Sequence, residues 1–208
     1  MTDRQTTRRR VTPLGGAGVE RSITLTDGIV AIAMTLLVLP LVDVTVDIDP
    51  DRIGASLAAH SDLFLSFAIS FVVTYLFWSA HAAAVRSVAD KGIDLPSINI
   101  LTMTWLLAIA FLPFPTAIVG RHLNTVSAPI YIGTLLLVSV LTALIGTLSS
   151  RAAPSTFRIR LAWTMTAILA FSTVLSMLDA DIGMYTLLLL ILARTIDSTV
   201  ARRRSPSG

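Results

Sequence analysis

Residues 20–40 read Glu20-Arg-Ser-Ile-Thr-Leu-Thr-Asp-Gly-Ile-Val-Ala-Ile-Ala-Met-Thr-Leu-Leu-Val-Leu-Pro40, and they contain most of the first predicted membrane helix. Residues 23–42 are long enough and apolar enough for a helix that crosses a bilayer, which needs about 20 such residues. A charged residue, Asp27, stands near the start of this helix. An ionisable side chain inside a membrane segment is costly, so Asp27 is a candidate functional residue.

Five further stretches have the same apolar character. We place them at about residues 63–85, 98–119, 129–149, 161–178 and 183–200. The last is the least uniform, because Arg194 and Asp197 lie inside it near its end, where a long side chain can reach the interface. The chain of 208 residues is 54% hydrophobic and only 14% charged, whereas a soluble domain has about 25% charged residues. The sequence therefore predicts an all-α integral membrane protein with six transmembrane helices.

The segments between these helices alternate in charge. The basic segments are the N-terminal region up to Arg21, the second linker, the fourth linker and the C-terminal tail, and they hold 13 of the 16 Lys and Arg residues. The first linker is acidic and contains Asp43, Asp47, Asp49 and Asp51. Because basic loops stay in the cytoplasm, both termini are predicted to be cytoplasmic. Two termini on one side require an even number of helices, which agrees with six.

The same pattern predicts the organisation of the chain. Residues 1–20 are basic and contain three glycines near their end, as is typical of a flexible cytoplasmic tail. Residues 21–200 form one six-helix membrane domain, and residues 201–208 form a second basic cytoplasmic tail. We expect a multi-pass protein of a bacterial inner (plasma) membrane.

The residues needed for common catalytic or metal chemistry are not grouped in this sequence. The three histidines, His60, His81 and His122, lack metal-site spacing, and there are no cysteines. The acidic linker begins like a calcium loop, but the required glycine and glutamate are replaced by Arg52 and Ala58. We therefore predict no enzyme, no metal and no cofactor. The basic residues are sorted by membrane side, so a nucleic-acid partner is not predicted either.

The first helix carries a regular stripe of residues. Gly28, Ile32, Leu36 and Leu39 recur at spacings of four, four and three, which places them along one helix face, with Thr35 beside it. By periodicity alone, such a stripe is more typical of a packing or lipid-facing surface than of a pore.

Several polar residues are predicted to gather near the cytoplasmic side. Trp78 and His81 lie three residues apart on the second helix and share a face, and Asn99 begins the third helix. A hydrogen-bonded cluster of Asp27, His81 and Asn99 is therefore geometrically possible. In the alternative interpretation each group is satisfied locally, and Asp27 pairs with Arg21 or stabilises the start of its helix.

These residues resemble a known family. Arg21-x-x-x-Leu25-Thr26-Asp27-Gly28 is similar to the Arg-x-x-x-Phe-Ser-Asp signature of the transmembrane protein 175 potassium channels. Further similarity lies in residues 29–39, in Trp78-x-x-His81, in Asn99 and in residues 112–117, so that motifs cover about the first 120 residues. The sequence departs from the signature at Leu25, where an aromatic residue is lost, and at Thr26, which keeps a hydroxyl.

The resemblance implies a six-helix subunit whose first helix lines a pore, assembled as a homotetramer in membrane lipid. Potassium is then the permeant ion, and the function is a leak-type channel with modest preference for potassium over sodium. The constriction positions of the family fall on Ile32, Leu36 and Leu39, and a selectivity position falls on Thr35. A neighbouring serine position of the family is Ala31 here.

The resemblance also implies a network that braces the pore helix. Its members are Arg21, Thr26, Asp27, Trp78, His81 and Asn99. If the first helix lines a pore, the acidic linker that follows it would ring the outer mouth and attract cations; otherwise it is only a solvated loop. Two other functions remain open from the residues: a proton-coupled small secondary transporter and a non-conducting scaffold subunit.

Overall fold

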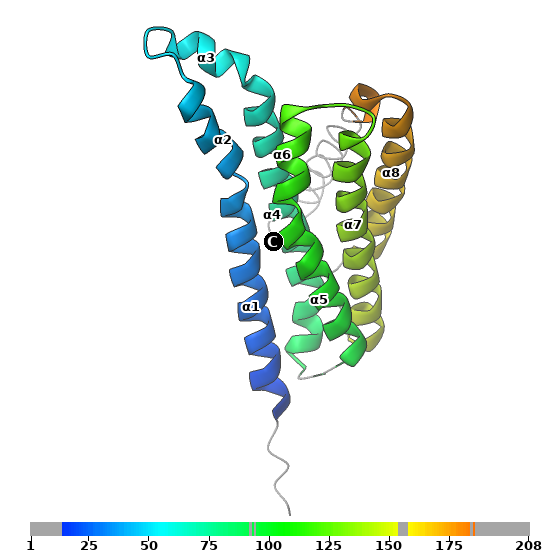
Figure 1. Ribbon diagram of the computed structural model, residues 1–208. Helices are drawn as coiled ribbons and strands as arrows, with labels where there is room; N and C mark the ends of the chain where they lie inside the picture. Colours follow the sequence, from blue (N-terminus) through cyan, green and yellow to red (C-terminus); the bar gives the residue numbers. More distant parts are fainter. Residues whose placement is uncertain (1–13, 92, 94, 154–157, 184, 186–208) are drawn as a thin grey trace, which may run out of the picture.

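The computed structural model describes residues 14–91, 93, 95–153, 158–183 and 185, and all of its regular structure is helical. Figure 1 shows α1 along one side of a bundle formed by the longer helices. The elements are α1 (Leu14–Leu36), α2 (Leu39–Asp43), the 3-10 helix η1 (Val44–Asp47), α3 (Ile53–Ala59), α4 (Ser61–Ala89), α5 (Pro96–Phe111), α6 (Pro113–Arg121), α7 (Ser127–Ala152) and α8 (Ile159–Leu178).

Five helical segments within the described residues are long and apolar enough to cross a membrane. They are Arg21–Asp47, Ser61–Ala89, Pro96–Arg121, Ser127–Ala152 and Ile159–Leu178, and they match the first five stretches predicted from hydropathy. The sixth predicted stretch, at about residues 183–200, lies almost entirely outside the described residues. Helix α1 begins at Leu14, so residues 14–20 of the expected tail are helical.

Helix α7 is the centre of the bundle. In its most apolar stretch 61% of the residues are buried, against 28% for the first and the last of the five segments. It packs against α4, α5, α6 and α8, and its Tyr131 and Leu135 are fully buried. Helix α1 is peripheral and contacts mainly α4 and α5.

The third segment is broken into α5 and α6 at Leu112, at the place where the sequence has two prolines. Pro113 has no N–H, so it cannot continue the α-helical hydrogen bonds, and it is well suited to the first position of α6. A buried set of hydroxyls fixes this break against its neighbours. Thr116 donates to Ser70 of α4 at 3.0 Å, and Ser70 is 2.8 Å from the hydroxyl of Tyr131 on α7.

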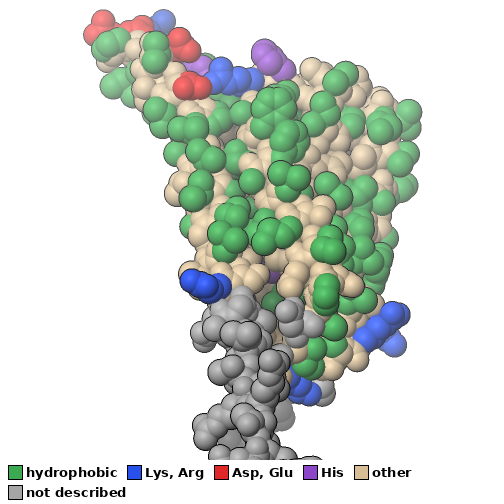
Figure 2. All heavy atoms as spheres, turned by 60° about the horizontal axis from the view of Figure 1, so that its bottom comes forward, with side chains coloured by type: hydrophobic (Ala, Val, Ile, Leu, Met, Phe, Trp, Pro, Cys, Tyr) green, Lys and Arg blue, Asp and Glu red, His purple; other side chains and the backbone are tan. Residues whose placement is uncertain are grey.

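The outer surface of the bundle has the character expected beside lipid. Large apolar side chains are exposed along its length, among them Leu107 (72%) and Phe171 (63%). Figure 2 shows hydrophobic and uncharged surface between an acidic patch at one end and basic side chains at the other. Because charged groups are excluded from the hydrocarbon region, this separation places the long helices across a membrane. The fold is that of a multi-pass membrane protein.

Close packing of α6 on α4 depends on Gly120. A Cβ atom at this position would overlap with Oγ of Ser66 and lie 2.9 Å from Cδ2 of Leu63. We predict that Gly120→Val forces the two helices apart and destabilises the fold by about 1–3 kcal/mol, as overpacking does. The measurement is thermal unfolding of the purified protein in detergent.

Gly54→Val is the matched control, because a Cβ at Gly54 meets nothing within 4 Å. It should leave the melting temperature of the protein nearly unchanged. Equal effects of the two substitutions would contradict the close approach at Gly120.

Candidate functional site at the first helix

Helix α1 packs on the rest of the subunit through one narrow stripe. Thr26, Val30, Ala33 and Leu37 are buried at spacings of four, three and four residues, which is one face of a helix. The small Ala33 permits close approach of a neighbouring helix, as is common between membrane helices. The stripe leaves the opposite face of α1 without contacts from the described part of its own chain.

The predicted constriction residues lie on this open face. The side chains of Ile32, Leu36 and Leu39 are 60%, 39% and 52% exposed. A Cβ at Gly28, one turn below Ile32, would meet nothing within 4 Å. Membrane-spanning surface of this kind is covered either by lipid or by another chain.

The predicted stripe is not one continuous helix. Helix α1 ends at Leu36, a turn follows at residues 37–38, and Leu39 begins α2. The cause is Pro40, which has no N–H to donate to the carbonyl of Leu36. Leu39 is therefore exposed from a second short helix rather than from the helix that carries Ile32.

Thr35 is exposed beside Leu36, and its hydroxyl is already oriented. Its Oγ1 donates to the carbonyl of Ile32 at 2.7 Å. A hydroxyl has one donor and two acceptor lone pairs. Because the proton points back to the helix, the lone pairs of Oγ1 are left to face outward, where they can accept a hydrogen bond or contact a cation.

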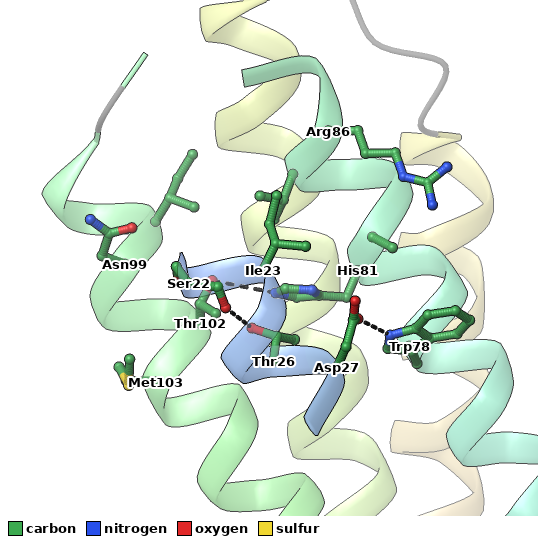
Figure 3. A pocket seen from close by; sticks show the side chains of 13 residues that line it. Ser22, Ile23, Thr26, Asp27, Trp78, His81, Arg86, Asn99, Thr102 and Met103 are labelled. Atoms are coloured by element: carbon green, nitrogen blue, oxygen red, sulfur yellow. Dashed lines mark hydrogen bonds between the residues drawn. The ribbon is translucent and has the colours of Figure 1, made fainter. Parts of the chain in front are cut away.

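The inner end of α1 is tied to α4 by one strong contact. Trp78 donates its indole N–H to Oδ1 of Asp27 at 2.7 Å (Figure 3). This short, charge-assisted bond joins residues 51 positions apart. Arg21 is exposed, and the described residues form no ion pair between Arg21 and Asp27. Of the interpretations for Asp27, the structure supports a link between helices.

His81 is held separately, behind Asp27. Its ring stacks on the indole of Trp105 with centroids 4.3 Å apart, and its Nε2 lies 3.3 Å from Oγ1 of Thr102. Trp105 in turn donates to Thr142 of α7 at 2.9 Å. The histidine is only 3% exposed and connects α4 to α5 and, through Trp105, to the central helix.

The members of the predicted polar cluster lie around one cavity. Asp27, Trp78, His81 and Asn99 all line a cavity of about 360 Å³ between α1, α4 and α5 (Figure 3). Thr26 also lines it and donates to the carbonyl of Ser22 at 2.8 Å. Arg21 is not among the described lining residues. The sequence thus identified five of the 13 residues that line this cavity.

The outer end of the first segment has its own anchor. Arg121 at the end of α6 forms an ion pair with Asp43 at 2.7 Å. The other predicted acidic residues, Asp47, Asp49 and Asp51, are exposed, and they lie between α2 and α3. Within the described residues, no group of three or more acidic or histidine side chains is placed to hold a metal ion.

Three residues of this region escaped the sequence analysis. Arg121, Thr102 and Trp105 lie 78, 21 and 24 positions from the side chains that they contact. No local pattern marks such partners. Thr102 and Trp105 do share a face with Asn99 at spacings of three, so helical periodicity could have placed them beside His81.

Comparison with known proteins gives two positive findings. Residues 21–113 match the family model described as endosomal/lysosomal potassium channel TMEM175. The fold is similar to the crystal structure of a lysosomal potassium-selective channel TMEM175 homolog from Chamaesiphon Minutus, with a TM-score of 0.73 and 21% sequence identity, over 88% of this chain and 98% of that chain. No match was found among curated protein sequences.

The fold and the half-packed first helix define a helical, multi-pass membrane protein. The matched region contains the first-helix motif, Trp78, His81 and Asn99. The match of residues 21–113 to this family model agrees with the family predicted from the first helix.

We predict that Trp78→Phe loosens the inner end of α1, because it removes the bond to Asp27 and keeps an aromatic ring. The coupling between Trp78 and Asp27 should be about 0.6 kcal/mol, the mean for polar pairs between membrane helices. The chain has no cysteine, so a spin label at Leu25→Cys, an exposed position of α1, reports the motion of this helix alone. The label should become more mobile in the variant.

Trp163→Phe is the control. It also removes an indole hydrogen bond, to Thr147 at 3.2 Å, but it lies on α8, away from α1. Equal label mobility in the two variants would contradict the anchoring role of Trp78.

Proposed function

We propose that the protein is a potassium channel in which four subunits surround a pore lined by α1. The observation that carries this proposal is the open face of α1, where Ile32, Thr35 and Leu36 are exposed. The family match and the fold support the same function. In a homotetramer the four open faces would cover one another around the axis.

The constriction is proposed to consist of stacked apolar rings. Four copies each of Ile32, Leu36 and Leu39 would form three rings, and a ring of this kind closes a pore by expelling water. Opening needs only enough widening for a partly hydrated ion. Because the turn at residues 37–38 separates Leu39 from the other two, the outermost ring can move independently of the inner ones.

Selectivity is proposed to arise from hydration cost and from Thr35. Potassium holds its water less tightly than sodium, so an apolar ring penalises potassium less. The outward lone pairs of Thr35 would replace part of the lost hydration, since its proton is committed to Ile32. The preference is modest, because the site lacks the ordered carbonyl rings of a sharply selective filter.

The acidic turn after α2 is proposed to be the outer mouth. Asp43 is paired with Arg121, so Asp47, Asp49 and Asp51 supply most of the negative potential there. Four copies would raise the local concentration of cations in front of the pore. In this arrangement the basic end of the bundle is cytoplasmic, with both termini and the basic tails 1–20 and 201–208 on that side of an inner membrane.

A proton-coupled carrier is the second candidate, because Asp27 and His81 line the same cavity. A carrier needs a relay of ionisable groups near the bilayer midplane. Here both groups lie toward the basic end, and the ring of His81 is stacked and buried, which favours a bracing role. The two functions differ in kinetics: a carrier saturates and couples to protons, whereas a channel does neither.

The channel is tested by potassium flux into liposomes that contain the purified protein. We predict that Leu36→Ala raises the flux about tenfold, which corresponds to a barrier lower by about 1.4 kcal/mol. Leu107→Ala, on the lipid-exposed face of α5, should leave the flux unchanged. Unchanged flux in Leu36→Ala would count against the constriction, and slow, saturable flux coupled to protons would shift the function to the carrier.

We predict that Thr35→Val lowers the potassium-to-sodium permeability ratio, because valine keeps the shape of the side chain and removes the oxygen. The ratio is measured from reversal potentials in planar bilayers. Thr104→Val is the control, since Thr104 is also exposed and also donates to its own helix, at 3.0 Å, but lies on α5. A drop in the ratio for both variants would argue against a specific role of Thr35.

The tetramer has a direct test. Because the chain has no cysteine, Leu36→Cys introduces a single thiol. Mild oxidation in the membrane should link subunits pairwise through this thiol, and native mass spectrometry of the unmodified protein should give the mass of four chains. Leu107→Cys should not form disulfide-linked pairs under the same conditions.

A further inference from the structure

A second cavity lies between α4, α7 and α8, on the side of α4 away from the pore helix. Its volume is about 200 Å³. Small side chains from all three helices leave this space open; they are Ser79, Ala80, Ala83, Ser139 and Ala162. Phe77, Leu161 and Met165 complete an apolar wall.

The hydroxyl groups inside this cavity are already engaged. Ser139 is 2.8 Å from Oγ1 of Thr166, and Thr142 donates to the carbonyl of Val138 while it accepts from Trp105. The inner wall of the cavity therefore offers an apolar surface to a bound molecule. The cavity is smaller than the 300–1,000 Å³ typical of drug-sized ligand sites, so the occupant must be narrow.

One charged residue is found among the described residues that line the cavity. It is Arg158, which immediately precedes α8. Arg151, in the last turn of α7, lies at the same end of the bundle, the end where basic side chains are exposed (Figure 2). A narrow apolar cavity with a guanidinium group at its membrane-interface end matches the two parts of an anionic amphiphile.

We propose that this cavity binds an anionic phospholipid of the inner leaflet, with part of one acyl chain between α4, α7 and α8 and the phosphate on Arg158. The second acyl chain remains in the bilayer, because the cavity is too small for both. The site goes beyond the proposed channel function, since binding does not require ion conduction.

The position of the site relates it to the pore helix. Ala80 and Ala83 of α4 face this cavity, whereas Trp78 and His81 of the same two turns face the cavity beside α1. Thr142 contacts Trp105, on which His81 is stacked. A bound acyl chain would therefore pack against the same segment of α4 that anchors α1.

The binding is tested by native mass spectrometry of the full-length protein, which counts lipids retained per chain after titration with phosphatidylglycerol or phosphatidylcholine. We expect at least fivefold stronger retention of one phosphatidylglycerol. Arg158→Gln should remove this preference, and Arg160→Gln is the matched control two residues away, because Arg160 is exposed and does not line the cavity. Ala80→Leu should fill the cavity and also reduce retention.

Each other outcome would overturn the proposal. If Arg158→Gln and Arg160→Gln reduce the retention of phosphatidylglycerol equally, the lipid is held by general attraction to the basic surface. If Ala80→Leu retains the lipid fully, no acyl chain enters the cavity. Displacement of the lipid by inorganic phosphate at comparable concentration would identify a free-anion site instead. If Ala80→Leu fails to fold, it is replaced by quenching of Trp105 fluorescence with phosphatidylglycerol that carries brominated acyl chains. The measurement uses the double variant Trp78→Phe, Trp163→Phe, in which Trp105 is the single tryptophan, because Trp105 adjoins the cavity through Thr142. An absence of quenching at the lipid ratio that saturates retention would then refute the site.

Discussion

The structure depends on the attachment of α1 along one side only. A stripe from Thr26 to Leu37 packs on α4 and α5, and polar contacts fix the two ends, Asp27 to Trp78 at one end and Asp43 to Arg121 at the other. Without a hydrophobic driving force between helices in lipid, such polar contacts and close packing must hold the helix in place. The opposite face, with Ile32 and Leu36, therefore stays available for a partner.

Much of this arrangement could be predicted from the sequence, because a helix that crosses lipid must consist mainly of apolar residues. Apolar stretches of sufficient length located the five described membrane segments. The first-helix motif led to the same family as the family model that matches residues 21–113. The face assigned to Ile32 and Leu36 followed from helical periodicity, and both residues are exposed in the structure.

The contacts that decide the site could not be predicted in the same way. A hydropathy pattern cannot predict the ion pair between Asp43 and Arg121 or the stacking of His81 on Trp105, because these partners are distant in the chain. Periodicity also treated residues 28–39 as one helix, whereas Pro40 ends it at Leu36. A hydrogen-bonded cluster and local satisfaction of each group were both open from the sequence, and in the structure Asp27 and His81 have different hydrogen-bond partners around one cavity.

The internal hydrogen bond of Thr35 has a consequence for how the protein is made. A threonine facing hydrocarbon with a free hydroxyl would penalise a lone subunit, but here Oγ1 donates to Ile32, and the residues around it are apolar. In a newly inserted chain, contact between this face of the first helix and lipid therefore has only a small free-energy cost. Folding of the single chain in the bilayer therefore does not require a partner for this face of α1.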